Sequence, residues 1–213
     1  GVVSQECFAH SEVSERVVFR RVSGANFYSP SGVCVPMENP RVDIVVLDQK
    51  AMEMEMLGQA QDAGVNAYSG WAGVDAEVHS DGVSVFASRK GSRWRVKGRS
   101  LVLASGFRGK IPQRLGLGNN GDFVIGAQVE LENRGINGIE VYTGQRFAPG
   151  FFGWGVPTYP GQVMVGVLAR KNPGSHLRAL LQHLVSLGKI DRTSEHITYG
   201  AIPLTPAQQT VAS

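Results

Sequence analysis

The chain has 213 residues, of which 42% are hydrophobic and 18% are charged, a composition that supports a packed core and excludes a disordered chain. Its formal net charge of +3 is too small to indicate nucleic-acid binding by itself. Two cysteines, Cys7 and Cys34, exclude a disulfide scaffold and a four-ligand zinc site, so a reduced, cytoplasmic setting is the default expectation.

The first half of the chain is predicted to combine short strands with helices. The 27 glycines among 213 residues exceed the usual share of about 7% and lie where turns are expected. Residues 4–10 are a candidate short helix, and the β-branched run 42–47 is a candidate buried strand. Asp48 can cap a following helix and Gly64 can end it. A hairpin is expected from 22–28 and 32–35.

The second half is predicted to be rich in strands, with one amphipathic helix. That helix should begin at Ser175, carry its leucines on one face and end at Gly188. The charge-free stretch 147–169 could span a bilayer, which takes about 20 residues, but its prolines and glycines favour strands over a transmembrane helix. Strands are predicted at 73–79, 83–88, 93–96, 99–103, 122–132, 138–145, 151–156, 162–169 and 195–201.

Two motifs suggest a nucleotide or nucleic acid but have plainer interpretations. Residues 116–121 fit the pattern G-x-G-x-x-G, yet an extended segment follows them where a dinucleotide loop would open a helix. The basic run 89–99 alternates charged with apolar residues, which indicates a strand with one solvated and one packed face. The five histidines form no metal-binding pattern. We therefore expect neither a metal nor a nucleic-acid partner.

Three patterns carry more information together than separately. The first is a strand followed by the sequence DQKAME at 48–53 and a helix; the second is LVLASGFRG at 101–109; the third is GFFGWGVP at 150–157, followed by VMVGV at 163–167. In this order and at these distances the chain resembles the geranylgeranyl reductase family of FAD-dependent oxidoreductases, which have the p-hydroxybenzoate hydroxylase fold. The resemblance covers nearly the whole chain but only the middle of such a protein, because the family's dinucleotide fingerprint and Gly-Asp flavin motif would lie beyond its two ends.

The resemblance implies that FAD carries the redox chemistry while the protein orients an apolar substrate. For Gln49 the alternative to cofactor binding is that it is an exposed polar residue in the first turn of a helix, which needs no ligand. For the aromatic residues the alternative is core packing. No residue stands out as catalytic. The implied cofactor-binding residues are Gly1 near the flavin ring, Gln49 at the strand-to-helix junction and Gly73 at the adenine end, and the implied substrate-binding residues are Phe152, Trp154 and Pro157, with Gly153 and Gly155 giving Trp154 room to turn.

The chain also departs from the family pattern. Gln49 stands where the family usually has Arg, and Ser105 where it has Asp. Gly109 replaces a frequent Ser, and Val156 replaces an aromatic residue. These changes affect the expected flavin contacts and substrate shape more than the expected fold.

We therefore expect an α/β fold, an α+β mixture that joins part of an FAD-binding domain to an antiparallel-rich mixed-sheet substrate domain. The first functional hypothesis is the central part of an FAD-dependent oxidoreductase that reduces or oxidises carbon–carbon bonds of an isoprenoid or other apolar substrate, with NADPH or ferredoxin as the open choice of electron donor. The alternative is a noncatalytic β-rich module that binds a hydrophobic ligand or partner. A cytoplasmic location is expected, with peripheral membrane contact left open. The expected boundaries are a flavin-domain linker at 1–21, substrate-domain strands at 22–47, a flavin-domain helix and β-meander at 48–115, the substrate domain at 116–205 and a return to the flavin domain at 206–213.

Overall fold

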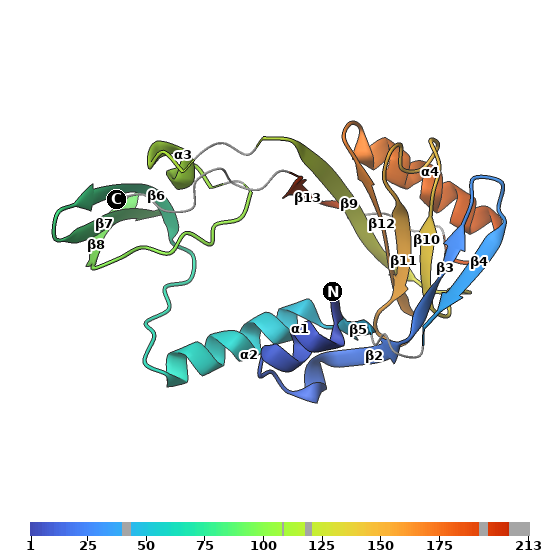
Figure 1. The fold of residues 1–213 in the computed structure, drawn as a ribbon, viewed down its shortest axis with the longest axis horizontal. Helices are drawn as coiled ribbons and strands as arrows, with labels where there is room; N and C mark the ends of the chain where they lie inside the picture. Colours follow the sequence, from blue (N-terminus) through green and yellow to red (C-terminus); the bar gives the residue numbers. More distant parts are fainter. Residues whose placement is uncertain (40–43, 108, 118–120, 192–195, 205–213) are drawn as a thin grey trace. The chain divides into compact units, whose positions relative to one another are not determined.

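The computed structural model describes residues 1–39, 44–107, 109–117, 121–191 and 196–204. The chain forms two compact units (Figure 1). Unit 1 contains Gly1–Val65 and Val124–Gly200, and unit 2 contains Asn66–Phe123 with the residues from Ala201 onward. The mixture of helices with parallel and antiparallel strands confirms the expected fold class. The expected segment 206–213 lies outside the described residues.

A seven-stranded sheet forms the framework of unit 1, with the strand order β13-β9-β12-β11-β10-β3-β4. Strands β10 and β3 pair in parallel, whereas β3–β4, β10–β11, β11–β12 and β12–β9 are antiparallel. The predicted hairpin and the strands predicted at 122–132, 138–145, 151–156, 162–169 and 195–201 are therefore confirmed in type, with shifted bounds. Their bounds are β3 Gly24–Tyr28, β4 Cys34–Glu38, β9 Phe123–Glu132, β10 Ile139–Tyr142, β11 Gly153–Pro157, β12 Gln162–Ala169 and β13 Thr198–Pro203.

One face of this sheet is covered by helix α4, Pro173–Ser186 (Figure 1). Its leucines recur at helical spacing and are buried against alternate residues of the central strands, which point to the same face. The predicted leucine face is confirmed, but the helix is capped by Asn172 in a left-handed conformation and not by Ser175. The core residues are Leu177, Leu180, Leu181 and Leu184 of α4 with Val163, Val165 and Val167 of β12.

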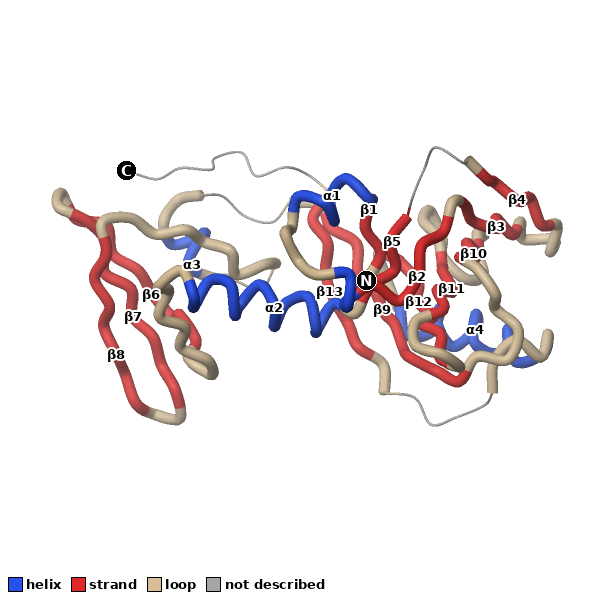
Figure 2. Tube along the Cα trace, turned by 90° about the horizontal axis from the view of Figure 1, so that it is seen from below, coloured by secondary structure: helices blue, strands red, loops and turns tan. Residues whose placement is uncertain are grey.

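A separate three-stranded sheet, in the order β1-β5-β2, lies in the same unit. Strand β5, Ile44–Leu47, pairs with β1, Val2–Ser4, and with β2, Val18–Val22. Figure 2 shows these strands beside helices α1, Gln5–His10, and α2, Gln49–Asp62. The predicted helices at both places are confirmed.

The expectation that residues 22–47 and 116–205 share one antiparallel-rich sheet is wrong for strand β5, which belongs to the small sheet. Val45 and Leu47 pack with Phe8 and Val17 on one side of the small sheet. Val46 packs on the other side, against Ile139 and Val156 of the large sheet. A strand buried on both faces reads as a continuous apolar run, so the sequence indicates its burial without indicating which sheet it joins.

Unit 2 is built on a three-stranded meander in the order β6-β7-β8. Its strands are β6 Ala72–His79, β7 Gly82–Arg89 and β8 Ser92–Gly98, and the short helix α3 spans Ile111–Arg114. The strand expected at 99–103 is absent from the described structure. Strand β7 begins at Gly82, and its last pair with β8 is Val83 with Gly98, so residues beyond Gly98 have no partner on β7.

The structure separates two elements that were expected to form one domain over 48–115. Helix α2 belongs to unit 1, whereas the meander belongs to unit 2. Their joint membership of a flavin domain stays a prediction. The charge-free stretch 147–169 forms β11 and β12, as predicted. Among the residues that the structure describes, no helix combines the length and the apolar character needed to cross a bilayer.

Candidate functional site

The aromatic residues predicted to contact substrate lie on the face of the large sheet opposite α4. Phe152 precedes β11, is 43% exposed, and its ring centroid lies 6.2 Å from that of the half-buried Trp154. Trp154 packs against the cluster formed by Val46, Ile139 and Val156. Phe152 and Trp154 therefore lie together at the border between the small sheet and an exposed part of the large sheet.

The position of the Trp154 indole depends on Gly166, the residue opposite it on the neighbouring strand. Trp154 pairs with Gly166 of β12, and a Cβ atom added at Gly166 would lie 2.2 Å from Cζ2 of the indole. Since no real Cβ contact is this close, Gly166 allows the ring to lie against the backbone of β12.

The two glycines beside Trp154 act differently from the sequence expectation. Added Cβ atoms at Gly153 and Gly155 would lie 2.9 Å from Leu180 Cδ2 and 3.0 Å from Ile136 Cδ1. These glycines make room for packing on the α4 face, because side chains alternate along a strand. The orientation of the Trp154 ring is set by Gly166 instead.

Pro157 does not join the two aromatic residues. It is buried at the end of β11 and pairs with Val163, which belongs to the core beneath α4. Residues 154 and 157 have opposite parity on a regular strand and so point to opposite faces. The structure therefore groups Phe152 with Trp154 and places Pro157 in the packing on the other side.

Two of the residues predicted to bind the cofactor meet in unit 1. Gly1 pairs with Leu47 through backbone hydrogen bonds of 2.7 and 2.9 Å. A Cβ atom added at Gly1 would lie 3.5 Å from Oε1 of Gln49. The Gln49 side chain is exposed, and its Nε2 donates to Oε1 of Glu53 at 2.9 Å. A side-chain-free backbone beside an exposed amide fits a polar cofactor group, since the amide can both donate and accept hydrogen bonds.

The residue between strand β5 and helix α2 organises this junction. Asp48 accepts a hydrogen bond from the Ala51 amide at 3.0 Å and so caps α2, as predicted. It also accepts a hydrogen bond from the hydroxyl of Tyr159. This hydroxyl and then the Ala51 amide hold the pKa of Asp48 below its ordinary value, while the carboxylate raises the pKa of Tyr159. Sequence reasoning missed Tyr159, because its partner lies 111 positions earlier in the chain.

Gly73, the third residue predicted to bind the cofactor, lies in unit 2 on β6. The β6–β7 register shifts between Gly73 and Asp75, which marks a bulge in the strand. A Cβ atom added at Gly73 would make only an ordinary contact, 3.4 Å from Ile111 Cδ1. Packing within the unit therefore does not require a glycine here. Close approach of a ligand to the backbone is one reason for a glycine inside a strand.

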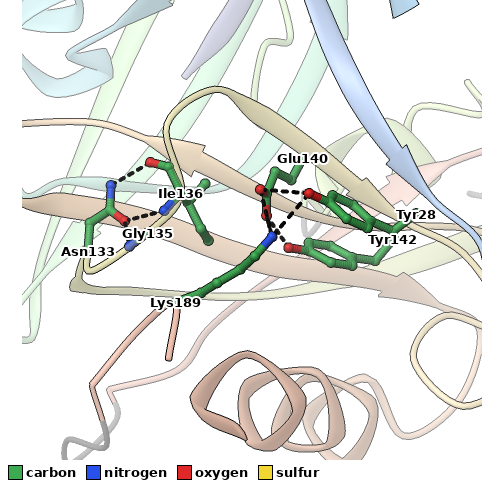
Figure 3. Close-up of polar contacts among 7 residues, drawn as sticks. All are labelled: Tyr28, Asn133, Gly135, Ile136, Glu140, Tyr142 and Lys189. Atoms are coloured by element: carbon green, nitrogen blue, oxygen red, sulfur yellow. Dashed lines mark hydrogen bonds and ion pairs between the residues drawn. The ribbon is translucent and has the colours of Figure 1, made fainter. Parts of the chain in front are cut away.

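A buried polar cluster, which sequence reasoning did not identify, lies on the α4 face of the large sheet (Figure 3). Lys189 Nζ lies 2.8 Å from both carboxylate oxygens of Glu140, and the two side chains are 17% and 5% exposed. The hydroxyls of Tyr28 and Tyr142 also donate to this carboxylate. The cluster joins the segment after α4 to strands β3 and β10.

The surroundings of this cluster shift three pKa values upward. Burial lowers the pKa of Lys189, but hydrogen bonds to Glu140 and Tyr28 outweigh that effect and leave it raised. Burial, and then the hydrogen bond to Glu140, raise the pKa of Tyr142 far above its ordinary value. Burial also raises the pKa of Tyr28.

Figure 3 also shows a turn near this cluster, in which Oδ1 of Asn133 accepts hydrogen bonds from the Gly135 and Ile136 amides at 3.2 and 2.9 Å.

Comparisons with solved structures define the class of fold. The chain is similar to a geranylgeranyl bacteriochlorophyll reductase-like protein from Thermoplasma acidophilum, with a TM-score of 0.84 and 16% identity, over 99% of this chain and 58% of that one. It also matches a flavoprotein/dehydrogenase from Cytophaga hutchinsonii, with a TM-score of 0.64 and 14% identity, over 85% of this chain and 50% of that one. The chain therefore shares its fold with these two proteins.

A relative found by sequence confirms the resemblance to geranylgeranyl reductases. The chain is 26% identical over 187 residues to digeranylgeranylglycerophospholipid reductase 1 from Methanothermobacter thermautotrophicus, a match that covers 82% of this chain and 47% of that protein. The chain thus spans about half the length of this relative. The sequence matches no family model. Within the described residues, no group of three or more potential ligands could hold a metal ion.

Proposed function

We propose that the chain is the central part of an FAD-dependent oxidoreductase of lipid biosynthesis that reduces carbon–carbon double bonds of an isoprenoid chain. The observation that carries this proposal is the placement of Phe152 and Trp154 on an exposed apolar face in a chain similar to a digeranylgeranylglycerophospholipid reductase. An apolar face suits an isoprenoid, because each CH₂ group removed from water gains about 0.8 kcal/mol. The alternative of a noncatalytic binding module is not favoured by the comparisons.

FAD would supply the redox chemistry, and the residues of this chain would hold it and shape its surroundings. We propose Gly1, Gln49 and Gly73 as residues that bind FAD, because their positions match those that the resemblance implies. The hydrogen bond to Glu53 uses one N–H of the Gln49 amide, so its second N–H and its oxygen can bond to the cofactor. The neutral amide provides a hydrogen bond without the positive charge of an arginine.

The proposed substrate-binding role belongs to Phe152 and Trp154, and Pro157 is proposed to support them through the strand backbone. Their rings would hold the apolar chain and exclude water from it. Saturation of one double bond requires two electrons and two protons, which end in two new C–H bonds. NADPH and ferredoxin are the proposed electron donors, and a cytoplasmic location with peripheral contact to membrane lipid is proposed for the whole protein.

The proposal is tested with the full-length protein reconstituted with FAD. Chemically reduced protein is mixed with an unsaturated isoprenoid glycerolipid, and the lipid is analysed by mass spectrometry. We expect a mass gain of two hydrogens for each double bond. NADPH and reduced ferredoxin are then compared as donors. Bound FAD that is reduced but leaves every isoprenoid unchanged would contradict the proposal.

A further inference from the structure

Trp154 is one member of an apolar row that crosses four strands in register. Val141 of β10 pairs with Trp154 on one side and with Phe27 of β3 on the other. Phe27 pairs in turn with Val35 of β4. Residues that are directly opposite on neighbouring strands point to the same face of a sheet. The row therefore runs from Trp154 to the edge strand β4 and contains no polar residue.

The row is exposed, and its exposure increases toward the sheet edge. Phe27 is 36% exposed and Val35 is 53% exposed, whereas Val141 is half-buried. The next row, which contains Ile139 and Val156, is covered by Val46 of the small sheet. Trp154 and Val141 border this covered cluster, whereas Phe27 and Val35 lie outside it and are exposed.

Gly166 directs the Trp154 ring away from the rest of the row. The indole lies over β12, on the opposite side of β11 from β10. The surface above Val141 and Phe27 is therefore not covered by this ring. Three strand spacings of about 4.8 Å give the row a length of about 14 Å, which exceeds the reach of a single isoprene unit.

We propose that this row, Trp154–Val141–Phe27–Val35, carries the distal part of the apolar chain, and that Phe27 and Val35 set the preference for chain length. The inference rests on the proposed function and adds residues that determine its specificity. The occupant is an extended apolar chain, because the row is narrow, continuous with Trp154 and lined only by apolar side chains. A long chain reaches Val35, whereas a short chain ends before it.

Binding is measured by calorimetry on the full-length, FAD-loaded protein with two unreactive probes, a fully saturated C20 isoprenoid alcohol and its C10 homologue. Phe27→Ser and Val35→Ser are expected to weaken binding of the C20 alcohol about tenfold, equivalent to about 1.4 kcal/mol, with little change for the C10 alcohol. Val33→Ser is the matched control. Val33 is 60% exposed in the β3–β4 turn, outside the row, and its replacement should change neither affinity.

Selective loss of C20 binding is the signature of an apolar chain lying along the row. Equal weakening for both alcohols, or no weakening for either, would overturn the inference. A loss of FAD affinity or of melting temperature in Val35→Ser would overturn it as well, because it would show that another part of the protein covers the row. Selective loss of C20 binding in a protein that reduces no isoprenoid would remove the proposed function and leave the row as a lipid-binding site.

Discussion

Removing the ammonium group of Lys189 should destabilise unit 1, because the Glu140 carboxylate would remain buried without a cation. In Lys189→Met the carboxylate, 5% exposed, keeps only the hydroxyls of Tyr28 and Tyr142. Breaking a buried ion pair costs about 3–5 kcal/mol. Because two hydrogen bonds survive, we expect the lower end of this range, about 3 kcal/mol.

Hydrogen exchange of the full-length protein measures this loss locally. A cost of about 3 kcal/mol corresponds to roughly hundredfold faster exchange, which we expect for amides of β3 and β10. Amides of β6–β8 in unit 2 serve as the internal control. The double variant Glu140→Gln/Lys189→Met should recover much of the protection, since it leaves no unpaired charge. Acceleration below about fivefold in Lys189→Met would refute the reasoning, because the pair would then behave like a surface ion pair worth less than about 1 kcal/mol.

Three further predictions concern the same unit. Trp154→Ala should alter substrate preference or turnover of the full-length enzyme while FAD stays bound; a loss of about 3–5 kcal/mol of stability with unchanged turnover per folded molecule would instead assign Trp154 to the core. Gly166→Ala should shift the tryptophan fluorescence and destabilise by about 1–3 kcal/mol, because its Cβ meets the indole; an unchanged spectrum and melting temperature would contradict the described ring position. The pKa values of Lys189 and Tyr142 are raised, so the folded state retains protons that the unfolded state loses above about pH 10. The free energy of unfolding, measured by denaturant titration, should therefore fall as pH rises beyond that point. Lys189→Met should make this fall with pH less steep.

Local signals in the sequence predicted the elements of this fold better than their partners. The cap at Asp48, the leucine face of α4 and the β3–β4 turn depend on neighbours within a few residues, and all three are confirmed. The sheet to which β5 belongs depends on contacts with distant residues, and that prediction was wrong. Likewise, alternation in the basic run 89–99 indicated strand character, but only pairing with β7 determines that β8 ends at Gly98.

The candidate site shows the same limit. The motif around Trp154 could be found from the sequence, and the structure groups Phe152 with it. The strand that carries Trp154 was predicted to end at residue 156, whereas β11 includes Pro157. Alternation along the strand then places Pro157 on the face opposite Trp154, and the face that α4 covers is settled only by folding. Glu140 and Lys189 are ordinary charged residues in the sequence, and only folding brings them together across 49 positions.

The parallel pairing of β3 with β10 has a consequence for synthesis of the chain. Ala25 of β3 pairs with Ile139 of β10, so the β3–β4 hairpin leaves the ribosome more than a hundred residues before the strand with which β3 pairs. Closing such a long loop is slow. During that interval β3 presents an unpaired edge and the hairpin exposes Phe27, Val35 and Met37, features that promote association between chains. Nascent chains that stop before β10 should therefore depend strongly on chaperones, and this dependence should end once β10 has been made.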